Sequence, residues 1–297
     1  MTGASPQFRR IVLELHRSGY DPTTVQLAVE LAELMHLDLF GRFIDDPGIV
    51  SLAGLPFARE FRVLECEWHV LDSEGVTRSR DLAIAAAQRL FAKAARTSTA
   101  TCHFEIVHET AAGAARAGVR AEDILVVSQA TGAAGRAAEP LPLAVDAAFR
   151  TAAGVLIVPG RIARRHGPVV AVVGGPDDPS VDVANALAIE AKEALLLLDL
   201  RSGVLSRAET GERATRTDDL LGLQRTPAAT ADAGAVTHLL GPTRERLIVV
   251  RRGVIDDAIL STIASRRGVP VLVLGSNGAG RPRSAASTRP LRAVGRT

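Results

Sequence analysis

The chain contains the same succession of segments twice, and this internal repeat constrains its fold more than any single motif does. Residues 122–160 and 245–276 each read as a buried-type strand, a helix-like segment and a second buried-type strand. The segments 11–34 and 169–191 also correspond, because each reads as a strand, a turn with an Asp-Pro pair and an amphipathic helix. A repeat of this length predicts one architecture built twice in tandem.

The Asp-Pro pairs Asp21-Pro22 and Asp178-Pro179 predict where the first helix of each copy begins. An N-cap aspartate accepts the free N–H groups of the first turn, and proline at the next position has no N–H to leave unpaired. Helices that alternate with apolar strands predict a parallel sheet covered on both faces. The expected fold class is therefore α/β, with two five-stranded parallel sheets, each flanked by helices on both faces and each with a ligand crevice at the carboxyl ends of its strands.

Length and composition agree with two domains. A chain of 297 residues has room for two cores, and the repeat places the domains at 8–160 and 167–276. Apolar residues make up 47% of the chain and aromatic residues only 3%, which favours aliphatic cores of the kind found in sheets between helices. Residues 277–297 are rich in Gly, Ser, Ala, Pro and Arg, and we expect a disordered basic tail there.

Charge and hydropathy exclude several classes of protein. The net charge is +2, but residues 281–297 hold five arginines and no acid, so the rest of the chain sums to −3 (+2 − 5). A nucleic-acid binder would carry its positive excess on the folded surface, so no nucleic-acid partner is expected. Apolar runs are too short for a membrane span, and the first ten residues lack the apolar core of a signal peptide.

Cysteine and histidine usage predicts the compartment and argues against a metal site. Cys66 and Cys102 are the two cysteines, which indicates a reducing compartment, and we expect a cytoplasmic protein. The histidines near them do not show the paired spacing of zinc ligands, so no metal site is predicted.

The first copy carries an insertion at about 45–98 that the second lacks. Its sequence predicts helices at about 58–71 and 78–95, and residues 49–68 combine many apolar side chains with the chain's only tryptophan, Trp68. Two interpretations stay open: a lid over the sheet edge of the first copy, or a surface that binds a partner or shields a ligand. The second copy has only the polar segment 201–223 there, which predicts the loss of a helix.

The loop that follows Val127 is the best candidate for a binding site. Its candidate residues are Ser128, Thr131, Gly132 and Gly135. Glycines let backbone N–H groups approach a phosphate, and the helix that follows offers its positive end. Because 26 glycines give about two Gly-x-x-Gly pairs by chance, the position of this pair directly after a strand is what distinguishes it from Gly275 and Gly278.

With this loop in place, the order of segments resembles the universal stress protein family in its tandem two-domain form. The likeness covers about 8–159 and 167–275 and rests on pattern and spacing more than on identities. It implies an ATP site made by an Asp at the end of the first strand and a Gly-x2-Gly-x9-Gly-Ser/Thr loop. The Asp position falls on His16 in the first copy and on Val173 or Gly174 in the second, so both copies depart from the pattern.

The loop departs from the family pattern as well. Gly132 and Gly135 match its start, but its terminal Gly-Ser/Thr falls on Val145-Asp146. The second copy has only Arg251-Arg252-Gly253-Val254 in this place, with no room for the loop. Losing the adenine carboxylate and the phosphate hydroxyl costs on the order of 2–5 kcal/mol, enough to move a micromolar site toward millimolar affinity.

The sequence therefore predicts a non-catalytic stress-response or regulatory binding module with weak or no ATP binding, acting through an unidentified protein partner or small ligand. The alternative is a nucleotide-binding protein that uses Ser128, Thr131, Gly132 and Gly135 of the first copy alone, with ATP or another adenine nucleotide as its cofactor. A third hypothesis is an enzyme of the wider adenine-nucleotide α-hydrolase-like group, for which no catalytic constellation is visible.

The resemblance also has a consequence for assembly. It implies that the final strands of the copies, 154–159 and 269–274, pair or pack across a pseudo-twofold axis. The chain would then be an intramolecular pseudo-dimer, and a homodimer of whole chains stays open.

Overall fold

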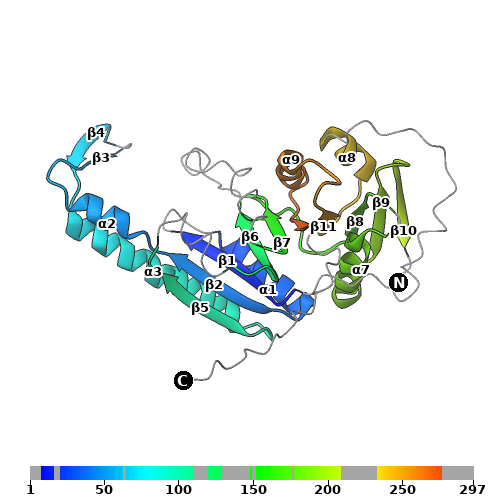
Figure 1. Ribbon diagram of the computed structural model, residues 1–297, viewed down its shortest axis with the longest axis horizontal. Coiled ribbons are helices and arrows are strands. Elements are labelled where there is room, and N and C mark those ends of the chain that lie inside the picture. Colours follow the sequence, from blue (N-terminus) through cyan, green and yellow to red (C-terminus); the bar gives the residue numbers. More distant parts are fainter. Residues whose placement is uncertain are drawn as a thin grey trace, which may run out of the picture.

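The structure is a computed structural model that describes residues 8–16, 21–62, 65–109, 119–128, 148, 152–175, 177–208 and 233–275 (Figure 1). The strands of the main sheet are β1 (Arg10–His16), β2 (Asp38–Ile44), β5 (Cys102–Val107), β6 (Asp123–Ser128), β7 (Gly154–Val158), β8 (Val169–Val173), β9 (Leu195–Asp199), β10 (Val204–Ala208), β11 (Leu247–Arg251) and β12 (Val271–Leu274). The helices are α1 (Pro22–Met35), α2 (Pro47–Ala53), α3 (Ser73–Ala95), α7 (Pro179–Ala191), α8 (Ala233–Leu240) and α9 (Asp257–Arg267). A separate hairpin pairs β3 (Arg59–Arg62) with β4 (Glu67–Val70).

The main sheet repeats one strand arrangement in its two halves, which we call the first half (β1–β7) and the second half (β8–β12). The strand order is β10-β9-β8-β11-β12-β7-β6-β1-β2-β5. In the first half β1 lies parallel between β2 and β6, and in the second half β8 lies parallel between β9 and β11. The predicted α/β class is therefore confirmed, whereas the predicted domain boundaries stay predictions and the tail 277–297 lies outside the described residues.

The expectation of two separate five-stranded sheets is wrong, because the halves share one ten-stranded sheet. The last strands, β7 and β12, pair antiparallel with Val155 opposite Val273. This confirms the predicted pairing of the final strands. Each of these strands would otherwise present an open edge of unpaired N–H and C=O groups, and joining the two edges removes both.

The second half also differs from the all-parallel prediction at its outer edge, where β10 is antiparallel to β9. The chain turns directly from one strand into the next, and the N–H of Gly203 donates to the carbonyl oxygen of Asp199 at 2.8 Å. A parallel neighbour requires a crossover, which is usually a helix. Because the connection between these strands has no room for one, the chain returns as a hairpin.

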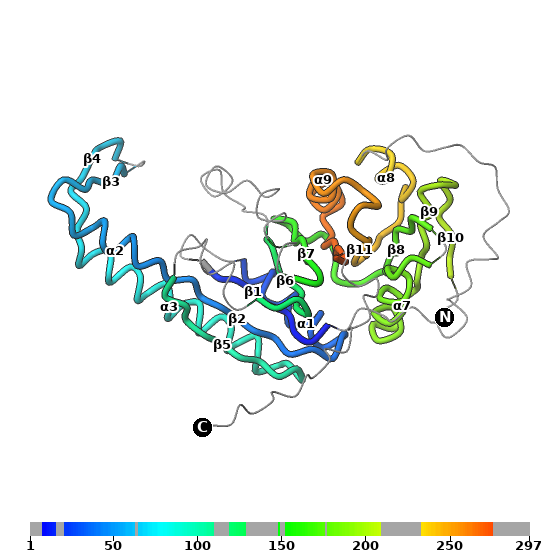
Figure 2. The backbone as a smooth tube through the Cα atoms, viewed as in Figure 1, coloured from blue at the N-terminus to red at the C-terminus, as the bar shows by residue number. Residues whose placement is uncertain are grey.

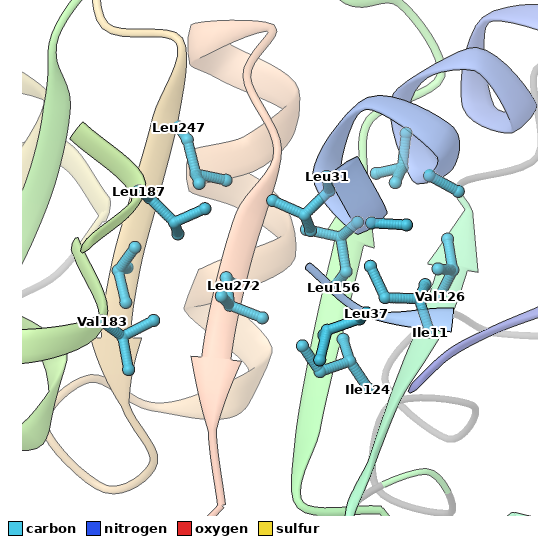
Figure 3. Packing of buried hydrophobic residues seen from close by; sticks show 14 of the residues in the cluster. Ile11, Leu31, Leu37, Ile124, Val126, Leu156, Val183, Leu187, Leu247 and Leu272 are labelled. Carbon is cyan, nitrogen blue, oxygen red and sulfur yellow. The ribbon is translucent and has the colours of Figure 1, made fainter. Parts of the chain in front are cut away.

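The hydrophobic core is continuous across the junction of the halves. Side chains alternate between the two sheet faces, so Leu156 and Leu272 join one buried cluster while Val155 and Val273 join the other. The first cluster lies under α1, α3 and α7, and the second lies under α8 and α9. Figure 3 shows Leu31 and Leu156 of the first half close to Leu272 of the second. The halves therefore pack as one body.

The repeat extends to the ends of the first helix in each half. The Asp21 carboxylate accepts the N–H of Thr23 at 3.0 Å, and that of Asp178 accepts the N–H of Ser180 at 3.1 Å, which confirms both predicted caps. Both helices end on a non-glycine residue in the left-handed region, His36 at φ 52° and Lys192 at φ 55°. None of the described helices has the length and apolar character needed to cross a lipid bilayer.

The insertion in the first half forms a projecting arm. We call residues 47–62 and 65–72, which include α2, β3 and β4, the hairpin arm. The helix predicted at 58–71 is wrong, because this segment forms the β3–β4 hairpin, and α3 begins at Ser73. Figures 1 and 2 show the hairpin at the far end of α2 and α3, away from the main sheet. The exposed side chains of Phe57 (75%) and Trp68 (64%) do not fit a lid packed over the sheet edge.

Candidate functional site

Each half has a topological switch point at the carboxyl ends of its two central strands, and we call this place its crevice. The chain leaves β1 toward β2 and later returns to β6 on the other side of β1, and β8 has the same relation to β9 and β11. In open α/β sheets ligands bind at such a switch point. The two crevices are therefore the candidate binding sites.

The structure describes one of the four predicted site residues. Ser128 is the last residue of β6 and is exposed, so it lies at the predicted edge of the sheet. Thr131, Gly132 and Gly135 lie outside the described residues. His16, at the position of the family Asp, is the last residue of β1, where its backbone pairs with Ile44.

A row of charges that sequence reasoning missed crosses the first half close to its crevice. Glu14, Arg42 and Glu105 are direct neighbours in the strand register. The Arg42 side chain is only 3% exposed, and its Nε donates to Oε1 of Glu105 at 2.8 Å while its Nη1 lies 3.6 Å from Oε1 of Glu14. Two carboxylates already balance this guanidinium, so it is a poor anion site. The available signal was the presence of charged residues within otherwise apolar strands.

A second polar group lies where β2 and β5 end. The Asp45 side chain is 7% exposed, and its Oδ2 lies 2.9 Å from Nδ1 of His108. Nη1 of Arg80 lies 4.0 Å from the same oxygen. Among the described residues, no hydrogen bond from a serine or cysteine to Asp45 or His108 is found. The hydrogen-bonded arrangement of nucleophile, base and orienting acid is therefore not assembled there. The described residues also contain no cluster of His, Cys, Asp and Glu suited to a metal ion.

In the second half, the Asp178 side chain lies against Gly174, one of the two residues at the position of the family Asp. The Asp178 side chain is fully buried, and its Oδ2 accepts the N–H of Gly174 at 2.9 Å. Its Oδ1 accepts the N–H of Ser180, and Nε of Arg251 lies 3.7 Å from Oδ2. This carboxylate therefore connects the loop after β8, the start of α7 and the end of β11.

The connection from β11 to α9 is a single tight turn. The N–H of Val254 donates to the carbonyl oxygen of Arg251 at 3.2 Å, and Gly253 has a φ of +84° that favours glycine. A Cβ atom on Gly174 would lie 2.9 Å from Cγ2 of Val254, so the valine closes the crevice from this side. The turn leaves no length of chain to surround a phosphate.

The N-terminus of α9, which follows the carboxyl end of β11, is occupied by the protein's own carboxylates. Asp256 caps the helix by accepting the N–H of Ala258 at 2.9 Å. Asp257 in the first turn accepts from Nε of Arg252 at 3.0 Å. A helix N-terminus attracts anions through its free N–H groups and its dipole, and here both act on side chains of the chain itself.

Two hollows in the described part of the chain lie away from the crevices. An internal cavity of about 20 Å³ lies at the junction of the halves, between Leu31 of α1 and Leu187 of α7. A space of this size holds about one water molecule, and ligand pockets are larger by an order of magnitude. A wider, shallow groove is lined by Ser73, Glu74, Thr77 and Arg78 at the start of α3.

Comparison with known proteins identifies structures of similar architecture but no relative by sequence. No family model matches the chain, and no curated protein is significantly similar to it in sequence. Among solved structures, a universal stress protein from Archaeoglobus fulgidus DSM 4304 aligns over 90% of this chain and 97% of its own, with a TM-score of 0.52 and 11% identity.

Two further structures are less similar in shape. A functionally unknown protein from Pseudomonas aeruginosa PAO1 aligns over 92% of this chain and 95% of its own, with a TM-score of 0.45 and 14% identity. A universal stress protein in complex with cAMP aligns over 51% of this chain and 97% of its own, with a TM-score of 0.32 and 21% identity. At these identities the likeness concerns shape, and the Archaeoglobus structure matches nearly end to end. The chain therefore has the fold of the universal stress proteins.

Proposed function

We propose that this chain is a non-catalytic binding module of the universal-stress-protein type, which acts in the cytoplasm through protein contacts or a small ligand and binds ATP weakly or not at all. The observation that carries the proposal is the second crevice. There Asp178 accepts the N–H of Gly174, Val254 lies against Gly174, and Asp256 accepts the N–H of Ala258, so neither N–H group is free for a purine or its phosphates. A nucleotide would have to displace a buried, fully hydrogen-bonded carboxylate, which costs several kcal/mol.

The first half supports the same proposal through different residues. His16 ends β1 in place of the family Asp, and Arg42 is already balanced by Glu14 and Glu105. An imidazole does not offer the two acceptor oxygens of a carboxylate to an adenine edge. Asp146, at the place of the family hydroxyl, would repel a phosphate.

Isothermal titration of the full chain with ATP, and separately with cAMP, tests the proposal. We expect dissociation constants in the millimolar range or no measurable heat, and no release of inorganic phosphate from ATP over hours. A micromolar dissociation constant for either nucleotide would overturn the proposal, as would steady hydrolysis that survives further purification.

Adenine-nucleotide binding by the first half alone is the second candidate, and the exposed end of β6 at Ser128 favours it. It requires Ser128, Thr131, Gly132 and Gly135 to form the phosphate loop. Under this alternative, ATP raises the melting temperature of the wild type, and Gly132→Val abolishes that rise. Gly278→Val is the matched control, because it alters the other Gly-x-x-Gly pair, outside both copies of the repeat.

A further inference from the structure

Exposed apolar side chains gather on the hairpin arm. Among the described residues nine large apolar side chains are exposed, and seven of them belong to this arm. The seven are Ile49, Leu52, Leu55, Phe57, Phe61, Trp68 and Val70. Soluble monomers rarely leave so many large apolar groups together in water, and such concentrations mark interaction surfaces.

The hairpin has one apolar face and one charged face. Phe61 pairs with Trp68 and Arg59 pairs with Val70 in the strand register, and directly opposed residues share a face. The Phe61 and Trp68 rings lie 5.3 Å apart, centre to centre. We call Phe61, Trp68 and Val70 the apolar face, with Arg59 at its margin. The next pair in register, Glu60 with His69, lies on the opposite face.

Within the described part of the chain, this hairpin has little support. β3 and β4 pack extensively against each other and at most slightly against any other described element. Figure 1 shows them beyond the ends of α2 and α3, on the side away from α7 and α8. A two-stranded hairpin alone is marginal in water and needs a layer packed on its apolar face. A partner that covers this face would supply that layer.

Charge argues that this partner is a protein. Residues 47–72 carry Arg59 and Arg62 against Glu60, Glu65, Glu67 and Asp72, so the arm has a net charge of −2 (2 − 4). Anionic membranes and nucleic acids select surfaces rich in Lys and Arg, which this arm does not provide. An apolar face with only Arg59 at its margin suits a protein surface, and contact with the same face of a second copy would leave the charged face of each hairpin in water.

The exposed area is of the size that a dimer needs. With 75%, 46% and 64% of their surfaces exposed, Phe57, Phe61 and Trp68 present on the order of 350 Å² together. The four aliphatic side chains add roughly as much, which gives about 700 Å² for each copy. Specific interfaces bury about 800 Å² per partner, with Trp and other aromatic residues at their centres.

We propose that the hairpin arm is a homodimerisation element, in which the seven exposed apolar side chains of one copy, including the apolar face of its hairpin, pack against the same side chains of a second copy. The contact is isologous, so the Trp68 side chains of both copies become buried in the dimer interface. It does not involve either crevice, and it leaves the β7–β12 junction of each chain intact.

Trp68 is the chain's only tryptophan, so its fluorescence reports on this surface alone. We expect sedimentation velocity over a micromolar dilution series to show a species of twice the chain mass of 31.2 kDa that dissociates on dilution. Over the same series, Trp68 emission should move to the red and acrylamide quenching should rise as the dimer dissociates. A monomer at all concentrations overturns the proposal, as does a dimer whose Trp68 stays as accessible as in the monomer.

The variant Phe57→Ser/Phe61→Ser keeps Trp68 as the probe and alters exposed side chains only. We expect its dimer dissociation constant to rise at least about 100-fold. Ile189→Ser is the matched control, because Ile189 on α7 is as exposed as Phe61 (46% each), and it should dimerise like the wild type. A double variant that still dimerises like the wild type overturns the proposal. So does a Trp68 blue shift that appears only with phosphatidylglycerol vesicles, which would assign the surface to a membrane.

Discussion

At the scale of single residues, each half contains a fully buried carboxylate that forms a two-pronged pair with one arginine. The Asp123 side chain is fully buried and accepts from Nε of Arg10 at 2.7 Å and from Nη2 at 2.9 Å. The Glu245 side chain is also fully buried and accepts from Nε of Arg267 at 2.7 Å and from Nη2 at 2.8 Å. Such two-pronged pairs fix geometry as well as charge. They show how acidic residues enter an aliphatic core of this kind.

Arg267→Met should lower the free energy of unfolding by about 3–5 kcal/mol, because it leaves the buried Glu245 carboxylate without its counter-charge. The hydrogen bond to Glu245 raises the pKa of the Arg267 guanidinium, so this guanidinium stays charged at all pH values used for folding. Urea titration measures the change. Adding Glu245→Leu to the variant should recover much of the loss, and Arg266→Met on the exposed neighbour is the control. A loss below 1 kcal/mol would show that the pair is dispensable.

At the scale of helices and strands, the sequence predicts what depends on local pattern and misses what depends on distant partners. The caps at Asp21 and Asp178 were predictable because the aspartate and the N–H group that it accepts are two residues apart. The partner of Asp123 lies 113 residues away, and no local pattern encodes it. The segment 58–71 was misassigned because it is largely exposed, and without a buried face apolar periodicity cannot separate a strand from a helix.

Helix α9 allows one prediction about a helix end. Gly268 ends this helix at φ +65°, and a Cβ atom there would lie 2.9 Å from Cβ of Ala163 in the segment that links the halves. Gly253 has a similar φ of +84° with open space around it. Gly253→Ala should cost about 1 kcal/mol for backbone strain, and Gly268→Ala should cost about 1–2 kcal/mol more because it also forces the linker away. Chemical denaturation of both variants measures the difference, and equal costs would show that the linker yields freely.

At the scale of the whole molecule, an ion pair between Arg246 and Glu30 joins residues 216 positions apart across the junction of the halves. The Arg246 side chain is 9% exposed, and the core continues through this junction. We therefore expect calorimetry to show one transition, with equal calorimetric and van't Hoff enthalpies. Arg246→Met should lower the stability of that single transition by about 1–3 kcal/mol.

Glu190→Gln is the control for this experiment, because the pair of Glu190 with His36 spans the same junction but is exposed and should contribute little. Two resolved transitions would show that the halves unfold independently. So would a variant in which only part of the calorimetric heat absorption shifts to lower temperature.

The antiparallel contact of β7 with β12 also limits which other subunits can pair with these two strands. Two halves on one polypeptide meet at an effective concentration in the millimolar range, so a free subunit of similar shape competes poorly for either edge. Separate single-domain subunits can exchange partners and form mixed dimers. In this chain the two halves are joined covalently, so their β7–β12 pairing forms within one polypeptide. Any change in its associations must therefore act on surfaces other than this junction.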